Sequence, residues 1–155
     1  MCGSSRIPVD KYLIPLFVYA PKHVQPRRVD RLMSQIDIPP TVLGLLDFRY
    51  YTKFFGRDVL RAPPASDRAF AANYQTLGYL KGDRMAVLQP KRKTAVLQIA
   101  TGAPVPAAAQ DPALMREAIS FYQVASYVFR NGLYLDEEQL IPEDRVAVAP
   151  RDPSR

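Results

Sequence analysis

The feature that most constrains the fold is an apolar run at residues 14–21, Ile-Pro-Leu-Phe-Val-Tyr-Ala-Pro. A short continuous apolar run of this kind, bounded by Pro, is typical of a strand that is covered on both faces, as in a mainly parallel sheet. Such a strand needs neighbours, and the chain supplies one clear run of this type. The sequence therefore predicts an α/β fold of which this chain is a C-terminal fragment.

A helix is predicted directly downstream, over residues 37–46. Asp37 is a favourable N-cap, because its carboxylate can accept hydrogen bonds from the free amides of the first turn. Pro39 lies in that turn, where a missing N–H costs little. Gly44 permits the close approach of another backbone. We therefore interpret Asp37, Pro39 and Thr41 as structural residues.

The segments on either side of this helix are less definite. Residues 29–36 fit either a helix, from their apolar spacing, or an extended run into the cap at Asp37. The aromatic stretch 48–55 is interpreted as packing between the helix and a strand. Tyr74, Tyr79 and Tyr122 are interpreted as core aromatics.

The second half of the chain has a different pattern. Residues 61–68, Arg-Ala-Pro-Pro-Ala-Ser-Asp-Arg, have the composition of a linker. Beyond them, apolar runs at 69–76, 77–80, 85–88 and 94–99 alternate with turn sequences, which predicts a meander of three or four antiparallel strands. A helix begun by Asp111-Pro112 and ended by Asn131-Gly132 is expected to pack across one sheet face.

Composition restricts the classes of function. No segment approaches the ~20 apolar residues of a membrane span, and the N-terminal region lacks the pattern of a secretory signal. Cys2 is the single cysteine, which excludes an internal disulfide framework. The net charge of +6 comes from scattered basic clusters, which are either solvated surface or sites for anionic partners such as phosphate esters or lipid headgroups. Nucleic acid is disfavoured, because no recognisable binding module is present.

Few residues are candidates for chemistry. His23 is the only histidine, so neither a Ser-His-Asp relay nor a multi-histidine metal site can be assembled from this chain. It either faces solvent or lies over an anionic group at the carboxyl end of the predicted strand. Ser4, Ser5 and Arg6 form either a phosphate-binding loop or a flexible start. We predict no catalytic and no metal-ligating residue.

Several short motifs occur in an order that matches a known family. They are Asp10-Lys11-Tyr12, Ile14-Pro15-Leu16, Tyr19-Ala20-Pro21, Ser34-Gln35-Ile36-Asp37-Ile38-Pro39-Pro40-Thr41, Leu43-Gly44-Leu45-Leu46, Phe54-Phe55-Gly56-Arg57-Asp58, Asn73-Tyr74-Gln75, Leu77-Gly78-Tyr79 and Tyr122-Gln123-Val124-Ala125-Ser126-Tyr127. This set resembles the C-terminal part of the sulfatase-like phosphoglycerol transferases, the group that includes lipoteichoic acid synthase, in the alkaline phosphatase and sulfatase superfamily. The resemblance extends through most of the chain, up to the region of Tyr134.

The resemblance implies a cell-envelope enzyme with a threonine nucleophile and a divalent metal such as manganese, which cleaves a phosphodiester and transfers a phosphoglycerol or similar group. In the family, the nucleophile and the first metal ligands lie upstream, and an Asp-His pair would directly precede Cys2. The resemblance therefore implies a chain that holds no cofactor and is inactive alone. Its partner would be the missing N-terminal catalytic part. The parent would be anchored in the inner membrane, with its catalytic domain facing the periplasm or the cell exterior.

Two hypotheses follow. In the first, residues 1–60 are the last strand and helix of a sulfatase-like catalytic domain, 61–68 a linker, 69–134 a small subdomain of antiparallel sheet plus helix, and 135–155 a partly disordered tail. In the second, the chain is a stand-alone accessory module that binds anionic lipid or glycan through its basic loops. The DNA directly upstream of the Met1 codon separates them, because an in-frame Asp-His there indicates the enzyme fragment.

Overall fold

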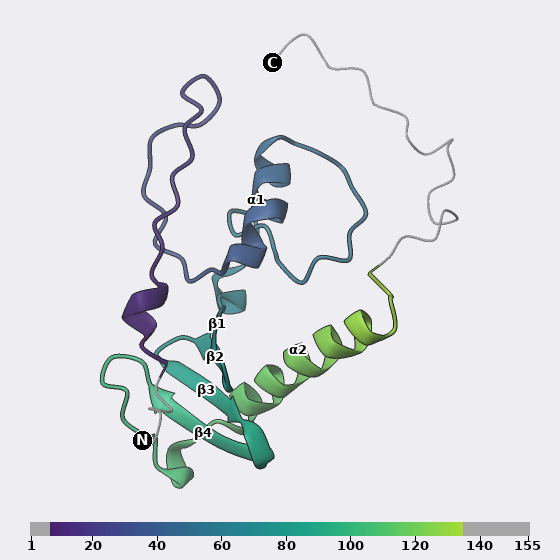
Figure 1. Ribbon diagram of the computed structural model, residues 1–155. Helices are drawn as coiled ribbons and strands as arrows, with labels where there is room; N and C mark the ends of the chain where they lie inside the picture. The colour runs from purple at the N-terminus through teal and green to yellow at the C-terminus, as the bar shows by residue number, and fades with distance from the viewer. Residues whose placement is uncertain (1–6, 135–155) are drawn as a thin grey trace.

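A four-stranded antiparallel sheet with a long helix on one face forms the ordered centre of the molecule (Figure 1). The computed structural model describes residues 7–134. The elements are α1 (Ile38–Leu45), β1 (Ala69–Asn73), β2 (Thr76–Lys81), β3 (Arg84–Gln89), β4 (Lys93–Gln98) and α2 (Pro112–Arg130), with short 3₁₀ helices at Val9–Tyr12, Gln35–Asp37, Pro64–Ser66, Pro90–Arg92 and Ala107–Ala109. The predicted α/β class, the small antiparallel sheet and its C-terminal helix are confirmed. The predicted tail lies outside the described residues.

The sheet is a simple meander in which each strand pairs with the next. The first strand ends at Asn73, earlier than predicted, because the Asn73 side chain accepts a hydrogen bond from the N–H of Gln75 at 3.2 Å and forms a turn. Gly82, with a φ of 59°, forms the turn between β2 and β3. Tight turns between neighbouring strands thus set the register.

The face of the sheet under α2 holds an apolar core. Tyr79, Ala86 and Val96 lie side by side on β2, β3 and β4, and Leu114 and Ala118 of α2 pack on them. The helix starts as predicted, because the Asp111 carboxylate accepts a hydrogen bond from the N–H of Ala113 at 2.8 Å. The C-terminal half of α2 extends beyond the sheet and leaves several apolar side chains exposed (Figure 1).

The opposite face of the sheet is covered by the N-terminal segment. Ile7 is buried against Leu80, Met85 and Val87. Gly78 makes this contact possible, because a Cβ at that position would lie 2.8 Å from the Ile7 Cδ1 atom. The two segments that the sequence analysis assigned to separate units are therefore in direct contact.

Both edges of the sheet are satisfied by other parts of the chain. On β1, the Ser34 hydroxyl accepts from the N–H of Phe70 at 2.7 Å, and the Tyr12 hydroxyl donates to the carbonyl of Ala72 at 2.5 Å. On β4, the N–H of Val105 donates to the carbonyl of Val96 at 2.8 Å. Edges that are satisfied in this way do not add further strands easily.

The predicted strand at 14–21 is not formed among the described residues. Residues 13–20 have no regular structure, a turn follows at 21–23, and the segment rises and returns as a long loop (Figure 1). The physical reason is that no other described segment pairs with it, and a strand needs hydrogen-bond partners for its backbone. Residues 29–36 are not helical, apart from the short 3₁₀ turn that begins at Gln35.

Candidate functional site

Asp37 is the centre of a buried polar network and is fully inaccessible to solvent. Its Oδ2 atom accepts from the N–H of Ser34 and its Oδ1 atom from the N–H of Arg57, both at 2.9 Å. The predicted cap is therefore only partly right. Asp37 occupies the N-cap position of α1, but its carboxylate makes no bond to that helix, because it is turned toward the preceding 3₁₀ turn and the loop at 57.

Arg68 neutralises this carboxylate. Its Nη1 atom lies 3.2 Å from both oxygens of Asp37, and its Nη2 atom donates to the carbonyl of Phe55 at 2.7 Å. The guanidinium also lies 5.0 Å from the ring centre of Phe70 and 5.2 Å from that of Phe121. A single side chain thus joins the region of α1 to the sheet and to α2.

Thr41 and two glycines bring the loop at 56–59 against α1. The Thr41 hydroxyl donates to the carbonyl of Asp37 at 2.6 Å and accepts from the N–H of Val59 at 3.1 Å. A Cβ at Gly56 would lie 1.8 Å from the carbonyl oxygen of Ile36, so only glycine fits there. A Cβ at Gly44 would meet the Asp58 carboxylate at 2.1 Å, so Gly44 accommodates a side chain and not the predicted backbone.

A second carboxylate extends the network. Asp67 accepts from Arg31 Nε at 2.7 Å and from Arg57 Nη2 at 2.9 Å. The hydrogen bond from Arg31 is the main cause that holds the pKa of Asp67 below its usual value, despite partial burial. Three guanidiniums, from Arg31, Arg57 and Arg68, therefore share two carboxylates. Among the described residues, Nε and Nη1 of Arg57 are buried without a hydrogen-bond partner.

A separate polar cluster ties α2 to β2. Glu117 accepts from the Tyr79 hydroxyl at 2.9 Å and from Lys81 Nζ at 2.8 Å. Burial raises the pKa of Tyr79, and its hydrogen bond to Glu117 raises it further. Burial alone would raise the pKa of Glu117, but the hydrogen bonds from Lys81 and Tyr79 hold it below the usual value. The cluster is a structural clamp, because each of its polar groups is already paired.

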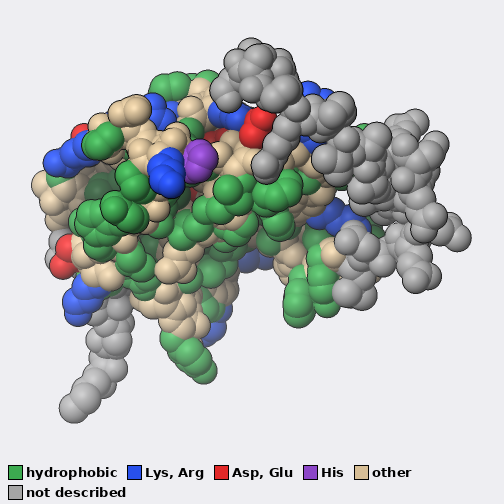
Figure 2. Space-filling model, turned by 90° about the horizontal axis from the view of Figure 1, so that it is seen from above, with side chains coloured by type: hydrophobic (Ala, Val, Ile, Leu, Met, Phe, Trp, Pro, Cys, Tyr) green, Lys and Arg blue, Asp and Glu red, His purple; other side chains and the backbone are tan. Residues whose placement is uncertain are grey.

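Exposed large apolar side chains are concentrated in two loops, 13–19 and 48–55. In the loop at 13–19, Leu13, Phe17 and Tyr19 are 74%, 87% and 91% exposed. In the stretch 48–55, which was predicted to be packed, Phe48, Tyr50, Tyr51 and Phe54 are all exposed. Figure 2 shows hydrophobic side chains gathered on the face that carries the histidine. We call residues 13–19 with these four aromatics the apolar face.

Of the predicted substrate-binding residues, only His23 lies in the described part of the chain. His23 is exposed in the turn after residue 20, where its N–H donates to the carbonyl of Ala20 at 2.9 Å. Ser4, Ser5 and Arg6 lie outside the described residues. Within residues 7–134, no three His, Cys, Asp or Glu side chains are grouped to hold a metal ion.

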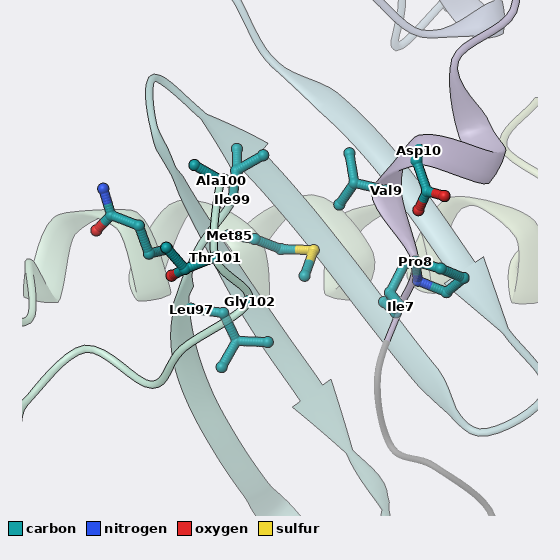
Figure 3. A pocket seen from close by; sticks show the side chains of 11 residues that line it. Ile7, Pro8, Val9, Asp10, Met85, Leu97, Ile99, Ala100, Thr101 and Gly102 are labelled. Atoms are coloured by element: carbon teal, nitrogen blue, oxygen red, sulfur yellow. The ribbon is translucent and has the colours of Figure 1, made fainter.

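A hollow of about 380 Å³ lies between the N-terminal segment and the end of β4 (Figure 3). Its mainly apolar lining includes Ile7, Met85 and Leu97, and Asp10 lies at its edge. Asp10 is the one titratable side chain among the lining residues, so the lining has no constellation for acid–base or nucleophilic chemistry. No helix in the described part of the chain is long and apolar enough to cross a membrane.

Comparison with known proteins agrees with the superfamily. No family model matches the sequence. The chain is similar to the crystal structure of a protein in the alkaline phosphatase superfamily from Vibrio parahaemolyticus, with a TM-score of 0.65 and 28% sequence identity over 74% of this chain. This chain spans 28% of the length of that protein. The similarity supports a relationship to the alkaline phosphatase superfamily.

Sequence reasoning missed the partners of Asp37. Arg68 and Asp67 stand at the end of a segment whose composition predicts a linker, yet both are bound in the ion-pair network. One sequence signal pointed to them, because two adjacent residues of opposite charge at the end of a Pro- and Ala-rich stretch are unusual for a simple linker. Which distant charge each one meets depends on how the chain folds back, and local composition does not contain that information.

Replacing Arg68 should be strongly destabilising. In Arg68→Met, the buried Asp37 carboxylate loses its countercharge, and we expect the free energy of unfolding to fall by about 3–5 kcal/mol. Arg28→Met, which removes an exposed ion pair with Asp30, should change it by less than about 1 kcal/mol. Urea unfolding followed by circular dichroism measures both. Equal losses of unfolding free energy in the two variants would show that the buried ion pair stabilises the fold no more than the exposed one. The double variant with Asp37→Asn should lose less than the sum of the single losses.

The lowered pKa of Asp67 predicts acid sensitivity. A carboxyl whose pKa is lower in the folded state stabilises the protein at pH values above its unfolded pKa, about 4, and this contribution is lost as pH falls through the folded pKa. Asp67→Asn should therefore be less stable at neutral pH and show a weaker dependence of unfolding free energy on pH below about 4. Asp30→Asn is the control at an exposed pair. An unchanged acid dependence in Asp67→Asn would contradict the assignment.

Proposed function

We propose that this chain is the C-terminal portion of a metal-dependent phosphoglycerol transferase or sulfatase-like hydrolase that acts on phosphodiester or sulfate ester substrates of the cell envelope. The similarity to an alkaline phosphatase superfamily protein, of which the chain spans 28%, supports the superfamily. The ordered sequence motifs support the phosphoglycerol transferase subtype. In this proposal, residues 1–60 belong to the catalytic domain, 61–68 link it, and 69–134 form an adjoining subdomain.

The observation that carries the proposal is the apolar face. Six large apolar side chains within residues 13–19 are each at least 48% exposed: Leu13, Ile14, Leu16, Phe17, Val18 and Tyr19. A concentration of exposed large apolar side chains as dense as this one is a feature of interaction sites. The same residues have the pattern of a strand that is buried on both faces. Both facts are explained if residues 13–19 join the sheet of a catalytic domain whose other strands come from the missing N-terminal part.

The chemistry would then belong to that missing part. The residues described here do not fit a divalent metal such as manganese, because no three candidate ligands are grouped among them. We therefore assign this chain no step of the reaction. Its contribution is to complete the catalytic domain and, through Arg68, to hold the subdomain against it. His23, Ser4, Ser5 and Arg6 are proposed contacts to an anionic phosphate ester or phospholipid headgroup. The parent is proposed to be anchored in the inner membrane and to face the periplasm or the cell exterior.

The first test is enzymatic. Purified residues 1–155 should show no manganese-dependent hydrolysis of bis(p-nitrophenyl) phosphate above the rate without protein. A phosphodiesterase of known activity confirms that the assay works, and circular dichroism confirms that the chain is folded. Robust turnover by the folded chain alone would overturn the proposal.

The second test addresses the apolar face. The isolated chain should self-associate as its concentration rises, because the exposed apolar surface has no cover. Phe17→Glu should reduce the average mass measured by sedimentation velocity toward that of a monomer. Tyr74→Glu replaces an aromatic that is 98% exposed outside the apolar face, and it should leave the association unchanged. A wild-type chain that stays monomeric at all concentrations would remove the main support for the proposal.

A further inference from the structure

Two turns of the meander lie at the same end of the sheet. Asn73 pairs with Thr76 across the β1–β2 turn, and Gln89 pairs with Lys93 across the β3–β4 turn. Since Leu77 pairs with Leu88, one register step places these two turns side by side. This end of the sheet carries Tyr74, Lys91, Arg92 and Lys93, and we call these four residues the sheet tip.

The sheet tip is exposed and carries uncompensated positive charge. Tyr74, which was predicted to be a core aromatic, is 98% exposed, and the three basic side chains are exposed as well. None of the three forms an ion pair within the described part of the chain. The sequence has no Asp or Glu between Asp67 and Asp83, or between Asp83 and Asp111. The strands and turns that form the tip therefore contribute no carboxylate.

The backbone of the β3–β4 turn is unusual for the residues it holds. The φ angles of Lys91 and Arg92 are 59° and 58°, in the left-handed region that favours Gly and Asn. Residues that adopt this conformation against their preference are found more often at functional positions. The turn thus presents two adjacent cations at positions where Gly or Asn would be less strained.

We propose that the sheet tip binds the surface of an anionic phospholipid bilayer. Lys91, Arg92 and Lys93 would attract the lipid phosphates, and the amphipathic ring of Tyr74 would lie at headgroup depth, where tyrosine is enriched in membrane proteins. A flat bilayer surface can reach all four residues, because they lie on two exposed hairpin turns at the end of the sheet. The hollow beside Ile7 lies near the other end of the sheet, where Ile99 bonds to Asp83. Binding to duplex DNA would usually neutralise more phosphates than three cations can contact.

The absence of tryptophan from the chain allows a direct test. Tyr74→Trp places the single tryptophan of the chain at the sheet tip, where it can be excited selectively over the remaining tyrosines. Its emission should shift to shorter wavelength when vesicles of equal parts phosphatidylglycerol and phosphatidylcholine are added, and it should not shift with phosphatidylcholine alone. Tyr19→Trp, which labels the apolar face at a site that is 91% exposed, should not shift. A shift at position 19 without one at position 74 would overturn the proposal.

A charge variant tests the cations. Replacing Lys91, Arg92 and Lys93 together by Gln should weaken co-sedimentation with the phosphatidylglycerol vesicles roughly 100-fold, since each basic residue near such a surface contributes roughly fivefold. The matched control replaces Lys22, Arg27 and Arg116, which are exposed elsewhere, and so lowers the net charge equally. It should weaken binding much less. An equal loss in both variants, or tip-dependent binding to duplex DNA without vesicle binding, would overturn the proposal. Neither result bears on the proposed enzyme origin, which the activity and association assays test.

Discussion

The contact between Asp37 and Arg68 is the interaction on which the rest of the structure depends. A carboxylate that is fully buried is destabilising unless it is paired and hydrogen-bonded. Asp37 satisfies this condition with two backbone amides and one guanidinium, and each donor comes from a different part of the chain. The 3₁₀ turn before α1, the loop at 57 and the segment leading into β1 are therefore fixed relative to one another. The position of α1 relative to the sheet therefore depends on this carboxylate.

The molecule has two kinds of apolar surface, and they differ in what covers them. The two faces of the meander are covered from within the chain, by α2 on one side and by the segment around Ile7 on the other. The apolar face at 13–19 and 48–55 has no such cover among the described residues. The proposed origin in an alkaline phosphatase superfamily enzyme accounts for this difference. In that enzyme, the rest of the catalytic domain would cover the apolar face, whereas the meander is already covered from within this chain. The sheet tip lies at an end of the sheet and is charged instead of apolar.

Local sequence signals predicted the second half of the chain well. Turn residues at short spacing and the Asp111-Pro112 helix start were enough to define the meander and α2, because hairpins and helix ends are determined by neighbouring residues. The same reasoning failed for residues 14–21. Their sequence has the pattern of a strand, but no described segment pairs with them, so no strand forms. Of the candidate site residues, the structure describes only His23, which it places in an exposed turn.

The sequence by itself determined the elements that depend on near neighbours, which are the antiparallel strands, their turns and the long helix. It also contained the motifs that indicate the superfamily. Only the tertiary structure decided which charges meet. Asp67 and Arg68 belong to a stretch with the composition of a linker, and Asp37 was expected to cap a helix. In the structure, Asp67 pairs with Arg31 and Arg57, and Arg68 pairs with Asp37, in each case with a residue at least ten positions away in the chain. The reason is physical. A hydrogen bond or ion pair between distant residues depends on how the chain is folded back, and no local pattern of residues encodes that path.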